Sequence, residues 1–575
     1  MHPASLPGLA CLVLLVAVSC GEAELEPPAE ASPCPGPATS IADIQGPEEV
    51  SPLLGNLVVT RGVVTRVEPG TGVYIEDSGS RDGSRSNGLF IESGEGWELP
   101  ARGQQIEVRG QVTELGSGPD QMTALTQAGS HSVCAEGVEL PSTVARLPLD
   151  PQARESLEGM RLTIEQPLVV TDVYDMHRGE WTVSPGEPLR LPTEDADPGP
   201  KAYDLGQLNR HHELELQLPG ADLPAVPVGT AVGRMEGVLG HNGSEQRFFP
   251  ETVPAVETPG PEPIEPPAAG HLRIVGANLL NYFNGDGQGG GFPTERGART
   301  PDEFREQQDR TRAALASLGP HLLAVQELEN DGFGPASAAQ SLLDLLNRTG
   351  ASDWAFVDPG SGPIGGDVIT VGLFYRRQSL EAVGPARVLR GPPFDGLSRQ
   401  PLAQVFRDRN SGETLLVAVN HLKSKGRCPE EGPDSGQADG QGCWNQARVA
   451  AVEYLTPWLS NVARETGTAR ILVLGDMNAW RREDPIRAFR AAGYIELVEE
   501  LSGLPQHSFL YFGQRGTLDY AFASPALLEN VRRAAIWHIN SDWPAGMRLP
   551  EPWLRMSDHD PVVVDVDFSQ TATSD

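Results

Sequence analysis

The stretch SDHDPVVVDVDF, residues 557–568, joins a polar turn to a valine-rich run. A short β-branched run bounded by such a turn predicts a buried strand. Six earlier runs have similar composition: LRIVGAN (272–278), LLAVQE (322–327), VITVGLFY (368–375), LLVAVNHL (415–422), ILVLGDM (471–477) and LDYAFAS (518–524). Helical patterns at 304–318 and 445–459 alternate with these runs. Together they predict an α/β domain over residues 271–568, with helices covering a sandwich of sheets.

Polar side chains recur at the ends of these runs, where a buried strand holds a group in fixed geometry. They are Asn278, Glu327, Asn420, His421, Asp476, Asn478, Asp519, Asp558 and His559. Carboxylate and amide oxygens bind hard divalent cations, a carboxylate can activate water, and a charged imidazole can stabilise a phosphoryl transition state. This set of residue types therefore suits metal-dependent phosphodiester hydrolysis.

Each of these motifs is weak alone, because an isolated Asp-His pair at a strand end is commonly a surface turn. Their order and flanks over residues 271–568 resemble the endonuclease/exonuclease/phosphatase superfamily. More specific segments resemble the bacterial extracellular nuclease family: RGARTPDEF (296–304), VQELENDGFG (325–334), KSKGRC (423–428), DGQGCWNQARVAA (439–451), GDMNAWRREDPI (475–486) and WHINSD (537–542). The resemblance implies a DNase-type four-layer α/β sandwich, with Mg²⁺ or Mn²⁺ as cofactor and Ca²⁺ as an alternative.

The resemblance also implies a role for each strand-end residue. Asn278, Glu327 and Asp558 would hold the metal. The catalytic set would be His421, Asp476, Asn478, Asp519 and His559. In that set Asp476 resembles the base that activates water, and His421 and His559 resemble imidazoles that contact the phosphate. Sequence alone leaves open how acid and base work is divided among His421, Asp476 and His559.

Three further residues are candidates for substrate contact: Asn420, Lys423 and Lys425. Two lysines in a polar loop are usually only solvated, but the neighbouring His421 would bring these two close to the phosphate. His538, in WHINSD, is either a substrate contact or part of a packed strand.

The region before the α/β domain has a β-rich pattern and divides into two blocks. Short β-branched runs separated by glycine-rich turns predict an OB-like barrel over residues 41–136. Gly62 and Gly110 lie within its strands, at points where such a barrel bends. A second β-rich domain is expected over 137–257, followed by a Pro-rich linker at 258–270. The whole chain is thus expected to be multidomain.

The N-terminus carries an export pattern. An apolar run from Leu9 to Val18 ends in Ala-Val-Ser-Cys, which resembles a bacterial lipoprotein signal over residues 1–20 with lipidation at Cys20. Plain secretion is the alternative. Residues 21–40 are acidic and Pro-rich and are expected to form a disordered tether. We therefore expect an exported protein, either anchored at the outer membrane or cell surface, or secreted.

Four cysteines remain beyond the signal, and an even number in an exported chain predicts disulfides. Cys428 with Cys443 would close a loop of about 15 residues, a constraint of about 3 kcal/mol. Cys34 would then pair with Cys134. The alternative, a zinc site, would normally use short Cys-x2-Cys spacings, which are absent from this sequence.

The net charge of -34 argues against a large basic nucleic-acid groove. The leading hypothesis is an exported nuclease that cleaves extracellular DNA, and the sequence leaves open whether RNA is a second substrate. It would contact a membrane only through a lipid at Cys20, and no protein partner is expected. The alternative is the same chemistry on a phospholipid or a small phosphoester. An inactive adhesin or scaffold ranks last, because such a protein would lack at least one of the site residues.

Overall fold

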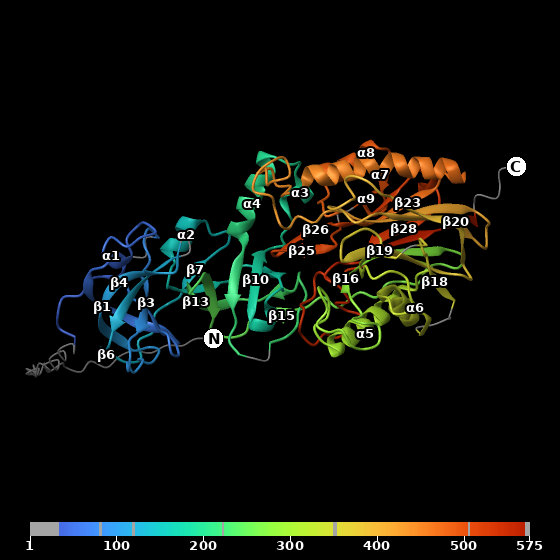
Figure 1. Ribbon diagram of the computed structural model, residues 1–575. Helices are drawn as coiled ribbons and strands as arrows, with labels where there is room; N and C mark the ends of the chain where they lie inside the picture. The colour runs from blue at the N-terminus through green and yellow to red at the C-terminus, as the bar shows by residue number, and fades with distance from the viewer. Residues whose placement is uncertain are drawn as a thin grey trace, which may run out of the picture.

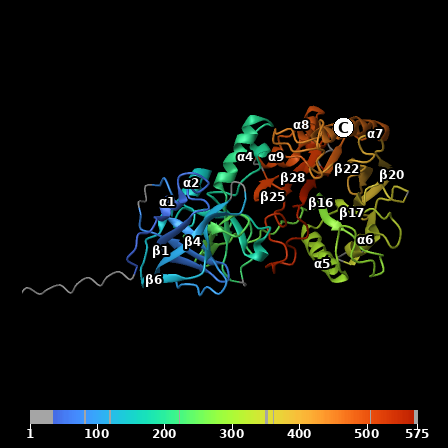
Figure 2. The same cartoon turned by 60° about the vertical axis from the view of Figure 1, so that its left-hand side comes forward.

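A computed structural model of the chain describes residues 34–79, 83–117, 121–220, 223–348, 353–360, 362–503 and 506–569. Figure 1 shows three successive regions along the chain, coloured from blue through green to red. Figure 2 keeps the green region between the other two. The expected signal peptide, Cys20 and residues 21–33 of the expected tether lie outside the described residues.

The first region is a single barrel-like sheet of six strands. Its strands are β1 (Leu57–Glu68), β2 (Gly72–Glu76), β3 (Gly88–Ser93), β4 (Gln105–Leu115), β5 (Met122–Ala128) and β6 (His131–Ala135). The order is β1-β2-β3-β5-β4-β6, and an additional pairing of β1 with β4 closes the sheet on itself. Gly62 on β1 allows a close approach to β2, since a Cβ there would lie 3.0 Å from Cβ of Ile75. Helix α1 (Ile41–Gln45) packs on the barrel, and a disulfide joins Cys34 to Cys134.

The second region is built on a nine-stranded sheet with the order β15-β12-β9-β10-β11-β14-β13-β8-β7. Its strands are β7 (Thr143–Ala145), β8 (Arg161–Ile164), β9 (Leu168–Asp172), β10 (Glu180–Pro185), β11 (Leu214–Gln217), β12 (Ala231–Val232), β13 (Met235–His241), β14 (Gln246–Pro250) and β15 (Val256–Glu257). Helices α2 (Pro151–Ser156), α3 (Pro192–Asp195) and α4 (Pro200–His212) and a short 3-10 turn, Met176–Arg178, lie between the strands.

The C-terminal region contains two six-stranded sheets. The first sheet, in the order β18-β19-β17-β16-β29-β28, comprises β16 (Leu272–Tyr282), β17 (Leu322–Glu329), β18 (Trp354–Phe356), β19 (Ile369–Arg376), β28 (Val531–Ile536) and β29 (Val562–Val566). The second sheet, in the order β20-β21-β22-β23-β27-β24, comprises β20 (Leu380–Val388), β21 (Leu402–Asp408), β22 (Thr414–His421), β23 (Ile471–Asp476), β24 (Ile495–Glu496) and β27 (Asp519–Ala523). One apolar core contains side chains from both sheets, which therefore pack face to face.

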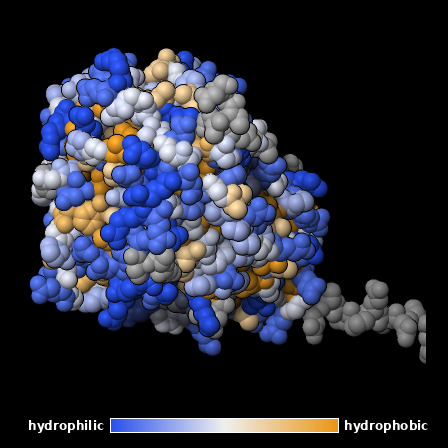
Figure 3. Space-filling model, turned by 90° about the vertical axis from the view of Figure 1, so that its right-hand side faces the viewer, coloured by the Kyte–Doolittle hydropathy of each residue, from blue (hydrophilic) through white to orange (hydrophobic). Residues whose placement is uncertain are grey.

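Helices cover the outer faces of the two sheets. Helices α5 (Pro301–Leu318) and α6 (Ala338–Arg348) share a core with the first sheet, and α7 (Asn445–Thr466) and α8 (Asp484–Ala491) share one with the second. Two short helices, α9 (Leu497–Ser502) and α10 (Pro525–Leu528), also lie beside the second sheet. The face of the molecule in Figure 3 is mainly hydrophilic with scattered apolar side chains. Among the described residues, no helix combines the length and the apolar character needed to cross a membrane.

The hairpin of β25 (Phe509–Tyr511) and β26 (Gln514–Gly516) connects the C-terminal region to the second one. The Thr171 hydroxyl donates to the Gly513 carbonyl over 2.5 Å, and the Arg515 guanidinium donates to the Val228 carbonyl over 3.2 Å. The carboxylate of Glu194 accepts the Thr517 backbone N–H over 2.9 Å. These bonds hold the second β region against one rim of the C-terminal region.

Candidate active site

The strand-end residues meet because parallel strands end at the same edge of a sheet. In the second sheet, His421 on β22 lies in register with Asp476 on the parallel strand β23. Asp476 is in turn in register with Asp519, the first residue of the antiparallel strand β27. Three of the predicted residues are thus direct neighbours on the sheet, and all three are buried.

The first sheet brings its residues to this site through irregular backbone. The pairing of β16 with β17 shifts after Asn278, and the pairing of β17 with β19 shifts between Val325 and Leu328. Glu327 lies in the second shift and has a left-handed φ of 61°. Such bulges turn side chains out of the strand alternation, and they occur often beside active sites.

The carboxylate of Asp476 is the centre of the arrangement. Its Oδ2 lies 3.5 Å from Nδ2 of Asn278, 3.4 Å from Nε2 of His421 and 3.9 Å from Nε2 of His559. Its Oδ1 accepts the Asn478 backbone N–H over 2.8 Å. Burial first, and then the charge of Asp519, raises the pKa of Asp476 to about 7 in the metal-free protein. A carboxyl group with this pKa can accept a proton near neutral pH.

The two imidazoles of the site differ in charge. Nδ1 of His559 lies 2.7 Å from Oδ2 of Asp519, which also accepts the Ser508 hydroxyl over 2.7 Å. Burial opposes the charge on His559, but Asp519 and Asp476 outweigh it and raise its pKa well above the usual range. Burial and the nearby Arg399 instead lower the pKa of His421 well below its usual range. His559 is therefore the cationic imidazole and His421 the neutral one.

The surroundings of Glu327 fit a hard divalent cation. Its Oε2 accepts the Asn281 backbone N–H over 2.9 Å, and Asn278 supplies a further hydrogen bond. Burial and then the charge of Asp558 raise the pKa of Glu327. Glu327, the nearby Asp558 and the amide of Asn278 form an oxygen donor set of the kind that Mg²⁺ and Mn²⁺ take.

One known protein family matches the C-terminal region. Residues 282–559 match the Endonuclease/Exonuclease/phosphatase family. The C-terminal region carries an endonuclease/exonuclease/phosphatase domain. This confirms the superfamily predicted from the strand-end motifs, and members of this superfamily are hydrolases that act on phosphoesters. No curated protein was found to match the chain.

Several solved structures resemble the endonuclease/exonuclease/phosphatase domain. The human Nocturnin catalytic domain with bound sulfate is 18% identical with a TM-score of 0.35, covering 53% of this chain and 96% of that one. A mannosyl-6-phosphatase from Bacteroides thetaiotaomicron is 15% identical with a TM-score of 0.35, covering 52% of this chain and 100% of that one. D. rerio TDP2 complexed with single strand DNA product is 16% identical with a TM-score of 0.32, covering 51% of this chain and 98% of that one.

The three expected substrate contacts lie in different surroundings. Asn420 is fully buried, and its Nδ2 reaches the Leu474 carbonyl at 3.5 Å. The Lys423 ammonium lies 4.8 Å from the centre of the Trp444 ring and donates to the Ser424 carbonyl over 2.9 Å. Lys425 turns away into an ion pair, with Nζ 2.6 Å from Oε2 of the buried Glu483. The structure therefore anchors the 423–428 loop through Lys425, and the disulfide Cys428–Cys443 holds the same loop.

Lys425→Met is expected to lower the free energy of unfolding by about 3–5 kcal/mol, because Glu483 would remain buried without its cation. Urea unfolding of the full chain measures this change. The double variant Lys425→Met with Glu483→Gln is the matched control and should recover part of the loss. Unchanged stability together with a raised KM would instead show that Lys425 contacts the substrate.

Arg399 is a site residue whose role the sequence did not indicate. Its Nε lies 3.2 Å from Oδ2 of Asp367, and its backbone N–H donates to the His421 carbonyl over 3.1 Å. The charges of Glu327 and Asp476 both act on its pKa, which burial lowers. Arg399 therefore places a guanidinium beside the carboxylates, where a phosphate oxygen would need a cation. Only the tertiary fold could show this, since Arg399 precedes β21 and Glu327 lies on another sheet.

Asp519→Asn is expected to lower kcat about 100-fold, because asparagine keeps the shape but removes the charge that helps to keep His559 protonated. As the pH is raised, the kcat of the variant should fall at a lower pH than that of the wild type, since the pKa of His559 would be lower. Ser508→Ala, which removes only the second partner of Asp519, should have a smaller effect. An unchanged pH profile would contradict a positioning role for Asp519.

A second cluster lies beside the site, where ring or carboxylate atoms of His507, His538 and Asp560 all lie within 4.8 Å of one another. The two rings stack at 4.1 Å, and Nε2 of His507 lies 3.0 Å from Oδ1 of Asp542. Asp560 already accepts the Ile539 and Asn540 backbone N–H groups and the Ser541 hydroxyl. These hydrogen bonds hold residues 539–541 against Asp560, while His538, which precedes them, is partly exposed and stacks on His507.

Proposed function

We propose that the chain is an exported, divalent-metal-dependent nuclease that hydrolyses phosphodiester bonds of extracellular DNA, and also of RNA. One observation carries the proposal: a carboxylate with a pKa near 7, Asp476, lies next to a cationic imidazole, His559, beside the oxygen donors of Glu327 and Asp558. A base, an acid and a cation site next to one another are the parts that in-line attack on a phosphodiester requires.

The residues divide the reaction between them as follows. Asp476 accepts the proton of the attacking water, and its orientation is fixed by the Asn478 backbone N–H. His559, held by Asp519, donates its proton towards the negative charge that develops on the phosphoryl and leaving oxygens. His421 is neutral and presents a ring nitrogen to the same carboxylate. Arg399 supplies a second positive charge near Glu327 and Asp476.

Asn278, Glu327 and Asp558 would hold Mg²⁺ or Mn²⁺, with Ca²⁺ as an alternative. A cation bound there would polarise the phosphate and neutralise part of its charge. Because the net charge of the chain is -34, attraction of a polyanion depends on local cations rather than on the whole surface. Lys423, Arg399 and the bound metal would supply that local charge.

We also infer the domain architecture of the chain: a DNase-type four-layer sandwich over residues 271–568, an OB-like barrel over 41–136, a second β domain over 137–257 and a linker at 258–270. The pairing of β1 with β4 and the face-to-face sheets support these assignments. Export rests on the signal-like sequence 1–20, with a lipid at Cys20, and agrees with the two disulfides. The tether expected over 21–40 ends before Cys34, because Cys34 is buried in its disulfide with Cys134 and the Thr39 backbone N–H donates to the Val59 carbonyl.

A substrate panel tests the proposal. The purified full chain with Mg²⁺ or Mn²⁺ should cleave single-stranded and duplex DNA, and RNA, faster than it releases phosphate from a sugar phosphate or a headgroup from a phospholipid. Release of phosphate or headgroup with nucleic acid left intact would overturn the nuclease assignment in favour of the small-phosphoester alternative. The variant His559→Ala is the negative control for contaminating nucleases.

A further inference from the structure

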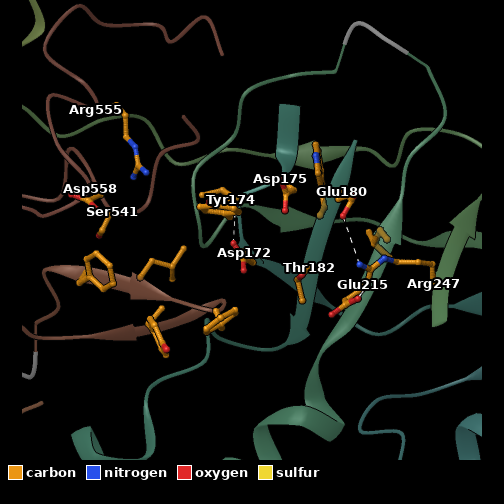
Figure 4. Close-up of a pocket in the computed structure, with 17 residues that line it drawn as sticks. Asp172, Tyr174, Asp175, Glu180, Thr182, Glu215, Arg247, Ser541, Arg555 and Asp558 are labelled. Atoms are coloured by element: carbon orange, nitrogen blue, oxygen red, sulfur yellow. Dashed lines mark hydrogen bonds and ion pairs between the residues drawn. The ribbon is translucent and has the colours of Figure 1, made fainter. Parts of the chain in front are cut away.

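A pocket of about 500 Å³ lies where the second β region meets the endonuclease/exonuclease/phosphatase domain. One side is formed by the end of β9 and by β10 and β11, and the other by the β25–β26 hairpin and residues 541–558. Figure 4 shows Asp558, Ser541 and Arg555 on one side and Tyr174 facing the interior from the other. Because Asp558 also belongs to the proposed metal set, the pocket adjoins the proposed active site at this residue.

Exposed aromatic rings concentrate at this pocket. Among the described residues, five Phe, Tyr or Trp side chains are exposed, and three of them, Tyr174, Tyr511 and Phe512, line it. Tyr174 and Phe512 are the most exposed of the five, at 77% and 75%. Apolar rings are rarely left this exposed in a cluster without a ligand or partner. The rings also lie near the proposed catalytic residues, since the ring centres of Phe509, on the same hairpin, and His559 are 4.6 Å apart.

The hairpin holds Phe512 in an unfavourable backbone conformation. Tyr511 pairs with Gln514, so Phe512 and Gly513 are the two central residues of the turn. Both have positive φ, 46° and 70°, a combination that favours Asn-Gly and disfavours a bulky residue at the first position. The Thr171 hydroxyl fixes the turn by donating to the Gly513 carbonyl. A strained and exposed ring at a fixed position beside an active site indicates a functional contact.

The charges of the pocket exclude phosphate as its occupant. Asp172, Asp175, Glu180 and Glu215 line it together with Asp558. Of the two guanidinium groups in the lining, Arg247 is engaged with Glu215 and Glu245, and Arg555 donates to the Asn540 carbonyl over 2.6 Å. Phosphate would be repelled here, whereas the flat uncharged face of a base would stack on the rings. Carboxylates can also accept hydrogen bonds from the amino groups of bases.

We propose that this pocket is a stacking subsite for a nucleobase of single-stranded nucleic acid, next to the phosphodiester held at the Asp476 and His559 centre. The inference rests on the proposed nuclease function and specifies single-stranded nucleic acid as a form of its substrate. The bases of a duplex are already stacked on one another, so only an unpaired base can enter between Tyr174 and the hairpin. The second β region thereby contributes directly to substrate binding.

The test compares a short single-stranded oligodeoxynucleotide with the same strand carrying abasic residues, both cleaved by the full chain with Mg²⁺. The principal variant is Phe512→Asn, because asparagine suits the positive φ and should keep or raise the thermal midpoint while removing the ring. Tyr174→Ala is the second variant. Each should raise KM for the normal strand about tenfold and leave KM for the abasic strand unchanged.

Tyr203→Ala, which removes an exposed ring on α4 outside the pocket, is the matched control and should change neither KM. Equal KM values for Phe512→Asn, Tyr174→Ala and the wild type on the normal strand would overturn the stacking subsite alone. If the wild type cleaved neither strand, the nuclease assignment would fall and the subsite with it. The two failures are therefore distinguishable.

Discussion

Asp476→Asn is expected to reduce kcat for phosphodiester cleavage by about 10³- to 10⁴-fold, the full contribution of a general base. Asparagine keeps the size of the side chain and can still meet the Asn478 backbone N–H, but it cannot accept a proton from water. Asp476 must be ionised to act, and its pKa is about 7. Wild-type activity should therefore fall as the pH drops below about 7, unless a bound cation lowers this pKa. A cation at Glu327 would move this acidic limb to lower pH.

The measurement is kcat against pH for the wild type and the variant on a single-stranded oligonucleotide. Asp408→Asn is the matched control, because Asp408 is also a buried carboxylate at the end of a strand. It lies at the opposite end of the strands from the site, since β21 runs antiparallel to β22, and its carboxylate accepts the Asn410 and Ser411 backbone N–H groups of its own turn. Near-wild-type activity in Asp476→Asn would remove Asp476 from the mechanism.

Glu327→Gln is expected to reduce activity at low Mg²⁺ by about 10³-fold, since metal polarisation of the phosphate contributes several kcal/mol. Glutamine preserves the hydrogen bond from Asn281 but removes the charge that would hold the cation. The loss should be partly recovered at high Mg²⁺ concentration, and calorimetric titration should show weaker binding of Mn²⁺.

Glu329→Gln is the control for this prediction. Glu329 lies two residues further along β17, and its carboxylate accepts the Asn284 backbone N–H over 3.0 Å. It should leave metal affinity and kcat close to those of the wild type. If Glu327→Gln bound Mn²⁺ as tightly as the wild type, the metal set assigned to Asn278, Glu327 and Asp558 would be wrong.

Local sequence signals were sufficient to place seven strands of the C-terminal region, β16, β17, β19, β22, β23, β27 and β29, and two of its helices, α5 and α7. The run 471–477 becomes β23, and the helical pattern at 304–318 becomes α5, which begins earlier, at Pro301, because Thr300 caps it. The pattern at 445–459 likewise continues to Thr466, where Gly467 ends the helix in a left-handed conformation. Element type could be predicted because each run is consistently apolar, whereas boundaries depended on capping residues.

The finer features of the site depend on contacts between distant segments. The bulge at Glu327 interrupts the two-residue alternation of the strand, so the sequence pattern could not reveal it. The sequence around Lys425 is typical of a solvated loop. Only the tertiary structure shows that Lys425 forms a buried ion pair with Glu483, 58 positions later. The aromatic pocket combines Tyr174 with a hairpin more than three hundred residues away, and neither part carries a recognisable motif alone.

The central claim is that a cation and the Asp476 and His559 pair together hydrolyse nucleic acid. The most direct test is plasmid DNA cleavage by chelator-stripped full chain, before and after Mg²⁺ or Mn²⁺ is returned, with His559→Ala measured in parallel. We expect no cleavage by the stripped protein, full recovery on adding either metal, and no recovery in His559→Ala. Cleavage that persists without metal, or that survives in His559→Ala, would contradict the claim.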